Sequence, residues 1–124
     1  MKTILFVEDD PVIVQVYRAP LLSAGYQVEV AADGLDAMRV MLPMNPALVI
    51  LDLFMPKVDG TYVLKFIRSK PELAEVKVIL LSDATIADVA KQALALNPDR
   101  VFLKSQCSPK ILTDAVQELL GPAN

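Results

Sequence analysis

The sequence lacks histidine, holds a single cysteine and contains no long apolar run. Without histidine the chain cannot build the Ser-His-Asp or Cys-His systems of nucleophilic catalysis, ligate a metal through imidazole, or donate a phosphoryl group from phosphohistidine. The lone Cys107 excludes an internal disulfide and argues against a cysteine-based zinc site. We interpret Cys107 as an incidental thiol.

Hydrophobic residues make up 54% of the chain, so a membrane protein has to be considered. However, no uncharged run reaches the roughly 18 to 20 residues that a spanning helix needs. Glu8 also interrupts the amino-terminal apolar stretch too early for a secretory signal. We therefore expect a cytoplasmic protein that does not insert into membranes.

Positive charge is also scarce, because 12 basic residues face 15 acidic ones and the net charge is -3. Phosphate backbones are bound mainly by clustered Lys and Arg, so direct binding to nucleic acid is disfavoured. Neither a Walker loop nor a GxGxxG fingerprint occurs, which argues against a nucleotide or dinucleotide site.

What the sequence does contain is a regular alternation of two patterns. Short runs rich in Val, Ile and Leu predict strands, and the segments between them place apolar residues at helical spacing. The expected strands are Thr3 to Val7, Tyr26 to Val30, Ala47 to Leu51, Val76 to Leu81 and Arg100 to Leu103. The expected helices are Pro11 to Ala24, Asp33 to Leu42, Thr61 to Ser69, Thr85 to Leu96 and Pro109 to Leu120.

Five strands alternating with five helices predict an α/β fold in which helices cover both faces of a parallel sheet. Asp10, Asp33 and Ser108 are expected to cap helices. Pro20 falls inside the first helical pattern and predicts a kink, or a helix that ends early and restarts. The last helix ends near the end of the sequence, so we expect residues 1–124 to form one domain without an output domain.

Polar side chains follow the strands at their carboxyl ends. In a parallel α/β sheet these ends meet at one edge, which is where ligands bind. The residues expected to converge there are Glu8, Asp9 and Asp10 after the first strand, Asp52 after the third, Ser82 after the fourth and Lys104 after the fifth.

Carboxylates without cysteine or histidine favour a hard cation with oxygen ligands, and a small site that retains waters suits Mg²⁺. Asp52 has a second potential role, because a carboxylate can attack phosphorus to give an acyl phosphate. Lys104 would stabilise charge on the transferring oxygens, and Ser82 could hydrogen-bond one of them. For Asp10 we favour a plain helix cap, since it directly precedes Pro11. Asp52, Ser82 and Lys104 could each also be ordinary turn or surface residues.

Four segments, ILFVEDDP, LVILDLFMPKVDG, VILLSDA and VFLKS, resemble the receiver domain of bacterial two-component response regulators. The resemblance covers essentially the whole chain, and LDLFMPKVDG is its most specific part. It implies a flavodoxin-like, doubly wound sheet of strand order 2-1-3-4-5, and a stand-alone receiver similar to chemotaxis regulators.

The resemblance also implies roles for individual residues. A phosphoacceptor switch of this kind is not a conventional enzyme, because its product is its own modified state. A histidine kinase or histidine phosphotransfer protein would donate the phosphoryl group, and a downstream protein would bind the phosphorylated form. The resemblance also allows a homodimer. The implied site comprises Asp52 as phosphoacceptor, Glu8 and Asp9 as the Mg²⁺-binding acidic pair, Phe54 as donor of a backbone carbonyl to Mg²⁺, and Ser82 and Lys104 as the switch hydroxyl and lysine.

Three positions depart from the family's pattern. Asp83 stands where a small residue is usual, Val101 replaces the usual aromatic switch residue, and Ser105 follows the lysine in place of proline. These departures motivate an alternative function, a degenerate receiver that binds proteins without phosphorylation. A third possibility, an aspartyl phosphatase of the DxD type, is disfavoured, because it would need a second acid two residues after Asp52, where Phe54 stands.

The expected first helix is more apolar than one buried face requires. The surplus predicts either an exposed docking patch or extra packing against the fifth helix. The residues concerned are Val12, Ile13, Val14, Val16 and Tyr17.

Overall fold

The computed structural model describes residues 2–53, 60–82, 91 and 95–123, and it contains a five-stranded parallel sheet of order β2-β1-β3-β4-β5. This is the predicted flavodoxin-like order. The strands are β1 (Thr3–Val7), β2 (Gln27–Ala31), β3 (Leu48–Asp52), β4 (Lys77–Ser82) and β5 (Arg100–Leu103).

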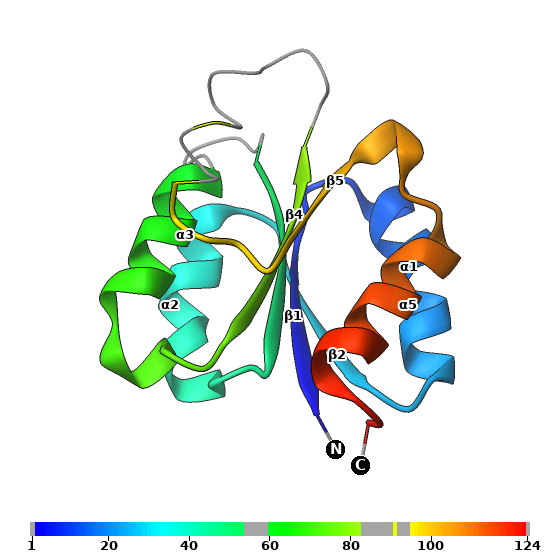
Figure 1. Cartoon of the computed structure of the whole chain (residues 1–124), viewed down its shortest axis with the longest axis horizontal. Coiled ribbons are helices and arrows are strands. Elements are labelled where there is room, and N and C mark those ends of the chain that lie inside the picture. Colours follow the sequence, from blue (N-terminus) through cyan, green and yellow to red (C-terminus); the bar gives the residue numbers. More distant parts are fainter. Residues whose placement is uncertain (1, 54–59, 83–90, 92–94, 124) are drawn as a thin grey trace.

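Helices cover both faces of the sheet, as predicted. α2 and α3 pack on one face, and α1 and α5 pack on the other (Figure 1). The described helices are α1 (Pro11–Ser23), α2 (Gly34–Met44), α3 (Gly60–Ser69) and α5 (Pro109–Leu120), with short 3-10 turns η1 (Pro71–Leu73) and η2 (Lys104–Gln106). The predicted helix from Thr85 to Leu96 falls mostly on positions outside the described residues. In the described part of the chain, no helix is both long and apolar enough to cross a membrane.

Burial follows each strand's place in the sheet. All five residues of the central strand β3 are buried, whereas each of the edge strands β2 and β5 combines exposed residues with buried or half-buried ones. Successive residues of β1 point to opposite faces, so Leu5 and Val7 enter the core under α2 and α3, while Ile4 and Phe6 enter the core under α1 and α5. The apolar runs of the central strands are therefore explained by helices on both sides.

Local signals for the helix starts are confirmed. The side chain of Asp10 accepts from the backbone N–H of Val12, that of Asp33 from Asp36, and that of Ser108 from Ile111. These caps satisfy N–H groups that have no partner inside the helix.

Of the two effects expected of Pro20, an early helix end followed by a restart is not found, and a kink stays a prediction. α1 is one continuous helix through Pro20 and ends only three residues later, at Ser23, so it does not end early and restart. The position explains this tolerance, since a proline near the last turn removes only one hydrogen bond close to a helix end.

The two ends of the described chain lie side by side, below the sheet in the view of Figure 1. The backbone N–H of Lys2 donates to the carbonyl of Ala123 at 3.0 Å, and the Lys2 ammonium donates to the carbonyl of Leu120. The Tyr26 hydroxyl donates to the carbonyl of Gly121 at 2.6 Å. These bonds fix both ends at the amino edge of the strands.

Candidate functional site

The carboxyl end of β1 places Glu8 inside the protein. Its backbone N–H donates to the carbonyl of Ala31 at 3.0 Å, which extends the pairing of β1 with β2 by one residue. The Glu8 side chain is consequently almost entirely buried, with the residue 2% exposed. A buried carboxylate is costly without a cation or hydrogen-bond donors, so this position requires compensation.

The next two acids have different environments from Glu8. Asp9 is exposed, and Asp10 is exposed at the start of α1. The side chain of Asp10 accepts the N–H of Val12 at 2.9 Å, while its own backbone N–H donates to Glu8 Oε1 at 3.2 Å. Asp10 thus serves as a helix cap and also orients Glu8, in agreement with the favoured interpretation of this residue.

Asp52 ends the central strand and is 1% exposed. Lys104, the first residue after β5, reaches across the strand ends to it. The ammonium Nζ lies 2.7 Å from Asp52 Oδ2 and 3.4 Å from Glu8 Oε2. The structure therefore brings together residues that lie 52 positions apart in the sequence, as the parallel topology predicts.

The electrostatics of Glu8 reflect its burial. Desolvation raises the pKa of Glu8 to about 7, the nearby charge of Asp52 raises it as well, and the charge of Lys104 only partly offsets both. Desolvation lowers the pKa of Lys104, but the hydrogen bond and charge of Asp52 and the charge of Glu8 outweigh it and leave that pKa above its ordinary value. Two buried acids thus share one ammonium, and the site is short of positive charge.

The carboxylates are arranged in a way that fits a divalent cation. Glu8, Asp9 and Asp52 each offer one oxygen, and these oxygens lie within 4.8 Å of one another. Glu8 Oε2 is buried and makes no hydrogen bond within the described residues, although Lys104 lies nearby. An oxygen-only donor set with one buried, unsatisfied oxygen is suited to a hard cation such as Mg²⁺.

Gly60, at the start of α3, lies against the end of β3 next to Asp52, a contact that the sequence analysis did not predict although Gly60 ends the LDLFMPKVDG segment. Its backbone N–H donates to the carbonyl of Leu53 at 2.9 Å. A Cβ atom on Gly60 would lie 2.6 Å from the carbonyl oxygen of Asp52 and 2.6 Å from the Cα of Leu53. Only glycine permits α3 to approach the end of β3 this closely.

Other predicted site residues are less fully described. Ser82 ends β4 and pairs in register with Leu103, but its side chain lies outside the described residues, as do Phe54 and Asp83. Val101 is partly exposed on β5. Their predicted roles stay predictions.

A small hollow of about 210 Å³ lies between α1 and the site. Val12 and Val16 are 67% and 48% exposed there, whereas Val14 and Tyr17 are buried. Some of the extra apolar residues of α1 are therefore packed in the core, and others are exposed at the surface. The hollow is lined by Val12, Ile13, Val16, Tyr17 and Lys104.

Known proteins share this sequence pattern. The model of the response regulator receiver domain matches residues 4–117. The Regulator of RpoS from Escherichia coli K12 is 37% identical over 122 residues, which are 98% of this chain and 36% of that protein. The chain therefore spans about a third of the length of this curated relative.

Solved structures share the fold. The receiver domain of a signal transduction histidine kinase from Syntrophus aciditrophicus superposes with a TM-score of 0.89 at 30% identity, over 97% of this chain and 90% of that one. The receiver domain of a sensor histidine kinase from Pseudomonas aeruginosa, which has a magnesium ion coordinated in its active site cleft, gives 0.86 at 28% identity, over 97% and 98%. Because the family model matches residues 4–117 and the fold is the same, the chain belongs to the response regulator receiver domain family of two-component signalling.

Proposed function

We propose that the chain accepts a phosphoryl group on Asp52 from a phosphohistidine and then changes its contacts with other proteins. The observation that carries this proposal is the position of the Asp52 carboxylate, which is buried at the end of β3, 2.7 Å from Lys104 and within 4.8 Å of oxygens of Glu8 and Asp9. A nucleophilic carboxylate beside a cation and a metal-binding acid pair suits phosphoryl transfer.

In this step an oxygen of Asp52 forms a bond to phosphorus while the bond between phosphorus and the donor's imidazole nitrogen breaks. The electron pair of the broken bond stays on that nitrogen, and Asp52 becomes an acyl phosphate. The Lys104 ammonium, already beside Asp52, interacts with the phosphoryl oxygens. The Ser82 hydroxyl is the proposed partner of another phosphoryl oxygen.

Glu8, Asp9, Asp52 and the backbone carbonyl of Phe54 are the proposed ligands of Mg²⁺. When bound, Mg²⁺ supplies positive charge that neutralises the acids and polarises the phosphoryl group. The chain itself holds the acceptor oxygen in place through the pairing of β3 with β4, where Leu53 donates to the carbonyl of Leu81 at 3.1 Å.

The donor is proposed to be a histidine kinase or a histidine phosphotransfer protein, because this chain has no histidine. A protein donor must cover the surface next to Asp52 to deliver its imidazole. The exposed Val12 and Val16 beside Lys104 offer apolar area for that contact. A downstream protein, a cytoplasmic location and a single receiver domain over residues 1–124 belong to the same proposal.

Incubation with Mg²⁺ and acetyl phosphate, followed by intact-mass measurement, tests the chemistry. We expect one added phosphoryl group in the wild-type chain and none in Asp52→Asn. Asp114→Asn, which removes an exposed carboxylate of α5, is the matched control and should be modified as the wild type is. Modification of Asp52→Asn would place the acceptor elsewhere.

A degenerate receiver that acts through protein contacts alone is the second candidate. Val101 and Ser105 favour it, because neither supplies the aromatic side chain or the proline usual at these family positions. The same experiment decides between them, since a wild-type chain that gains no mass with Mg²⁺ and the phosphodonor supports the second candidate.

A further inference from the structure

The charge of α3 is opposite to that of the chain. Residues 60–70 carry Lys65, Arg68 and Lys70 and no acid, although the whole chain has a net charge of -3. Tyr62, Lys65, Phe66 and Ser69 are spaced by three, one and three residues, so they share one side of the helix. We call this side, together with Lys70, the outer face of α3.

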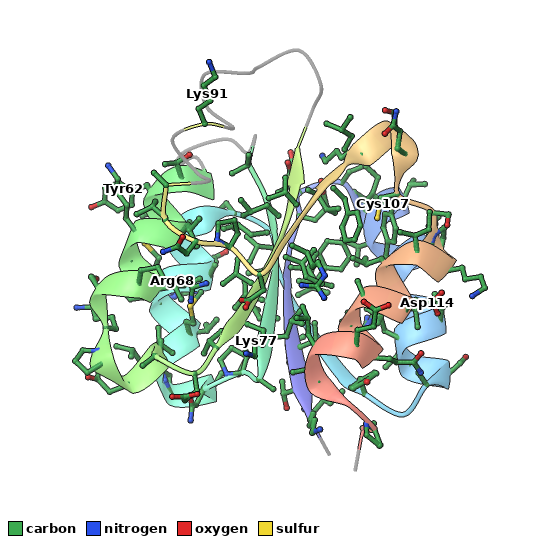
Figure 2. All side chains as sticks on the ribbon, viewed as in Figure 1. Tyr62, Arg68, Lys77, Lys91, Cys107 and Asp114 are labelled. Carbon is green, nitrogen blue, oxygen red and sulfur yellow. The ribbon has the colours of Figure 1, made fainter. Side chains whose placement is uncertain are left out.

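The outer face combines aromatic side chains with lysines around them. A hollow of about 290 Å³ is lined by Tyr62, Lys65, Phe66, Ser69 and Lys70. Tyr62 is 61% exposed and lies on the side of α3 away from the sheet (Figure 2). The Lys70 ammonium is 5.3 Å from the centroid of the Phe66 ring, which is a cation-π distance.

The two lysines of this face are available to a partner. Within the described residues, neither Lys65 nor Lys70 forms an ion pair with a carboxylate. By contrast, Arg68 lies 3.5 Å from Asp99, and Lys110 on α5 lies 2.7 Å from Asp114. An external anion can thus reach the two lysines of the outer face without breaking an ion pair to a described carboxylate.

We propose that the outer face of α3 is a docking site for an acidic segment of another protein, one that carries an aromatic or large apolar side chain among its carboxylates. The carboxylates pair with Lys65 and Lys70, and the apolar side chain fills the hollow beside Tyr62 and Phe66. Aromatic side chains are enriched at the centres of protein interfaces and the rim is polar, which suits Tyr62 and Phe66 at the centre and the two lysines at the edge.

Nucleic acid is a poorer match for the same face. Two lysines neutralise few phosphates, and the net charge of -3 repels a polyanion at longer range. The proposal is also independent of phosphorylation on Asp52, because it depends only on the exposed side chains of α3 and Lys70.

Titration of the isotope-labelled chain with a synthetic peptide, followed by NMR, tests the proposal. The peptide holds several glutamates around one central phenylalanine. We expect amide shifts concentrated on α3, and at least a tenfold loss of affinity in the Lys65→Glu/Lys70→Glu variant. The matched control, Arg39→Glu/Lys110→Glu, changes the net charge equally on α2 and α5 and should retain the wild-type affinity. Dispersed spectra of both variants verify that they fold.

Several results would overturn the proposal. One is a peptide titration that leaves the α3 amides unshifted, and another is an equal loss of affinity in both double variants, which would indicate non-specific charge attraction. A peptide with alanine in place of phenylalanine should bind several-fold more weakly, and equal binding contradicts the role of the hollow. Tighter binding of a single-stranded oligonucleotide or of anionic lipid vesicles to the same face would replace the proposed partner.

Discussion

The charge of Glu8 depends strongly on its burial and on the charged groups beside it. It is buried, and its neighbouring cation Lys104 lies closer to Asp52 than to Glu8. Burial therefore raises the pKa of Glu8 to about 7. The folded chain keeps a proton on Glu8 between about pH 4.5 and 7, a range in which the unfolded chain has lost it.

In the absence of Mg²⁺ we expect the wild-type chain to lose stability as the pH rises from about 4.5 to 7, because the folded state binds more protons there than the unfolded state. The full effect is up to about 3 kcal/mol. Glu8→Gln cannot lose this proton, so its stability should lack this decline and exceed that of the wild type at pH 8. Urea unfolding with a chelator at a series of pH values measures the difference.

Glu118→Gln provides the control for this experiment, since Glu118 is an exposed acid of α5. The free energy of unfolding of this variant should change with pH as that of the wild type does. If the free energy of unfolding of Glu8→Gln also followed the wild type, the titration of Glu8 would not contribute to stability in this range.

The positions of the site residues could be predicted because each lies at the end of a strand or just after it. Glu8, Asp9, Asp52 and Lys104 come directly after apolar runs, and parallel strands bring their carboxyl ends to one edge. The sequence could not predict that Glu8 is buried while Asp9 is exposed. That difference depends on which side of the strand end the neighbouring elements cover.

At the scale of elements, the start of α3 packs closely against the backbone at the end of β3. Gly60 permits this close packing because it has no side chain. A Cβ atom there would lie 2.6 Å from backbone atoms of both Asp52 and Leu53. Backbone atoms cannot rotate away as a flexible side chain can. The start of α3 therefore fixes the position of the Asp52 backbone.

For Gly60→Ala two effects compete. Alanine favours the helix by up to about 1 kcal/mol, but the clash forces α3 or the end of β3 to move. We expect the clash to dominate, with a net loss of about 1 to 3 kcal/mol in the free energy of unfolding and slower phosphorylation of Asp52. Urea unfolding and timed mass measurements check both.

Ser69→Ala, an exposed substitution in the last turn of the same helix, should change the unfolding free energy by less than about 0.5 kcal/mol. A Gly60→Ala chain as stable as this control would show that the site has room for a methyl group.

Arg68 connects α3 to two other segments. Its guanidinium donates to the carbonyls of Val76, Leu96 and Asn97 at 3.2, 3.2 and 2.8 Å, and it lies 3.5 Å from Asp99. Asp99 in turn accepts the backbone N–H of Val78 at 2.7 Å. The arginine thereby holds the segment that enters β5 against the start of β4.

Arg68→Met should remove about 2 to 4 kcal/mol from the free energy of unfolding, because three carbonyls and one carboxylate lose their partner at a partly buried position. Hydrogen exchange should rise in residues 95–99 more than in β1. Arg39→Met is the matched control, since its pair with Asp36 is exposed and contributes less than about 1 kcal/mol. Unchanged exchange in residues 95–99 would contradict this role of Arg68.

The fold was predictable because strand and helix signals alternate along the whole chain. Periodicity predicts β1, β5 and α5 at their observed bounds, and β2, β3 and β4 are displaced by one residue. The contacts of Arg68 could not be predicted, since they join segments 28 and 29 residues apart through side-chain geometry. Periodicity predicts the end of α2 two residues early, at Leu42, although Asn45, which caps the helix with a φ of 46°, and the following Pro46 are typical of a helix end.

At the scale of the whole molecule, cation binding at the strand ends should stabilise the entire fold. The acids there lie at the carboxyl ends of β1 and β3, which are neighbouring interior strands of the sheet, so relief of their repulsion stabilises the whole cooperative structure. Mg²⁺ that binds the folded chain alone adds about 2.7 kcal/mol at a concentration 100 times its Kd.

We expect Mg²⁺ to raise the urea midpoint of the wild-type chain at constant ionic strength, and to do so more at pH 8 than at pH 5, where Glu8 is protonated. Asp9→Ala should abolish most of this increase, and Asp114→Ala, which alters an exposed acid of α5, should not. Calorimetric titration with Mg²⁺ provides an independent measurement. An Asp9→Ala chain that responds as the wild type does would show that the acidic cluster does not hold the cation.

The adjacent ends of the chain have a practical consequence. Lys2 and Ala123 meet at the amino edge of the sheet, and a five-residue strand such as β1 separates that edge from the acids by about 16 Å. A tether to a sensor chip or a fluorophore on either end would therefore leave the acidic edge facing the solution. A peptide of a few residues could also join the two ends, which makes the molecule suitable for circular permutation.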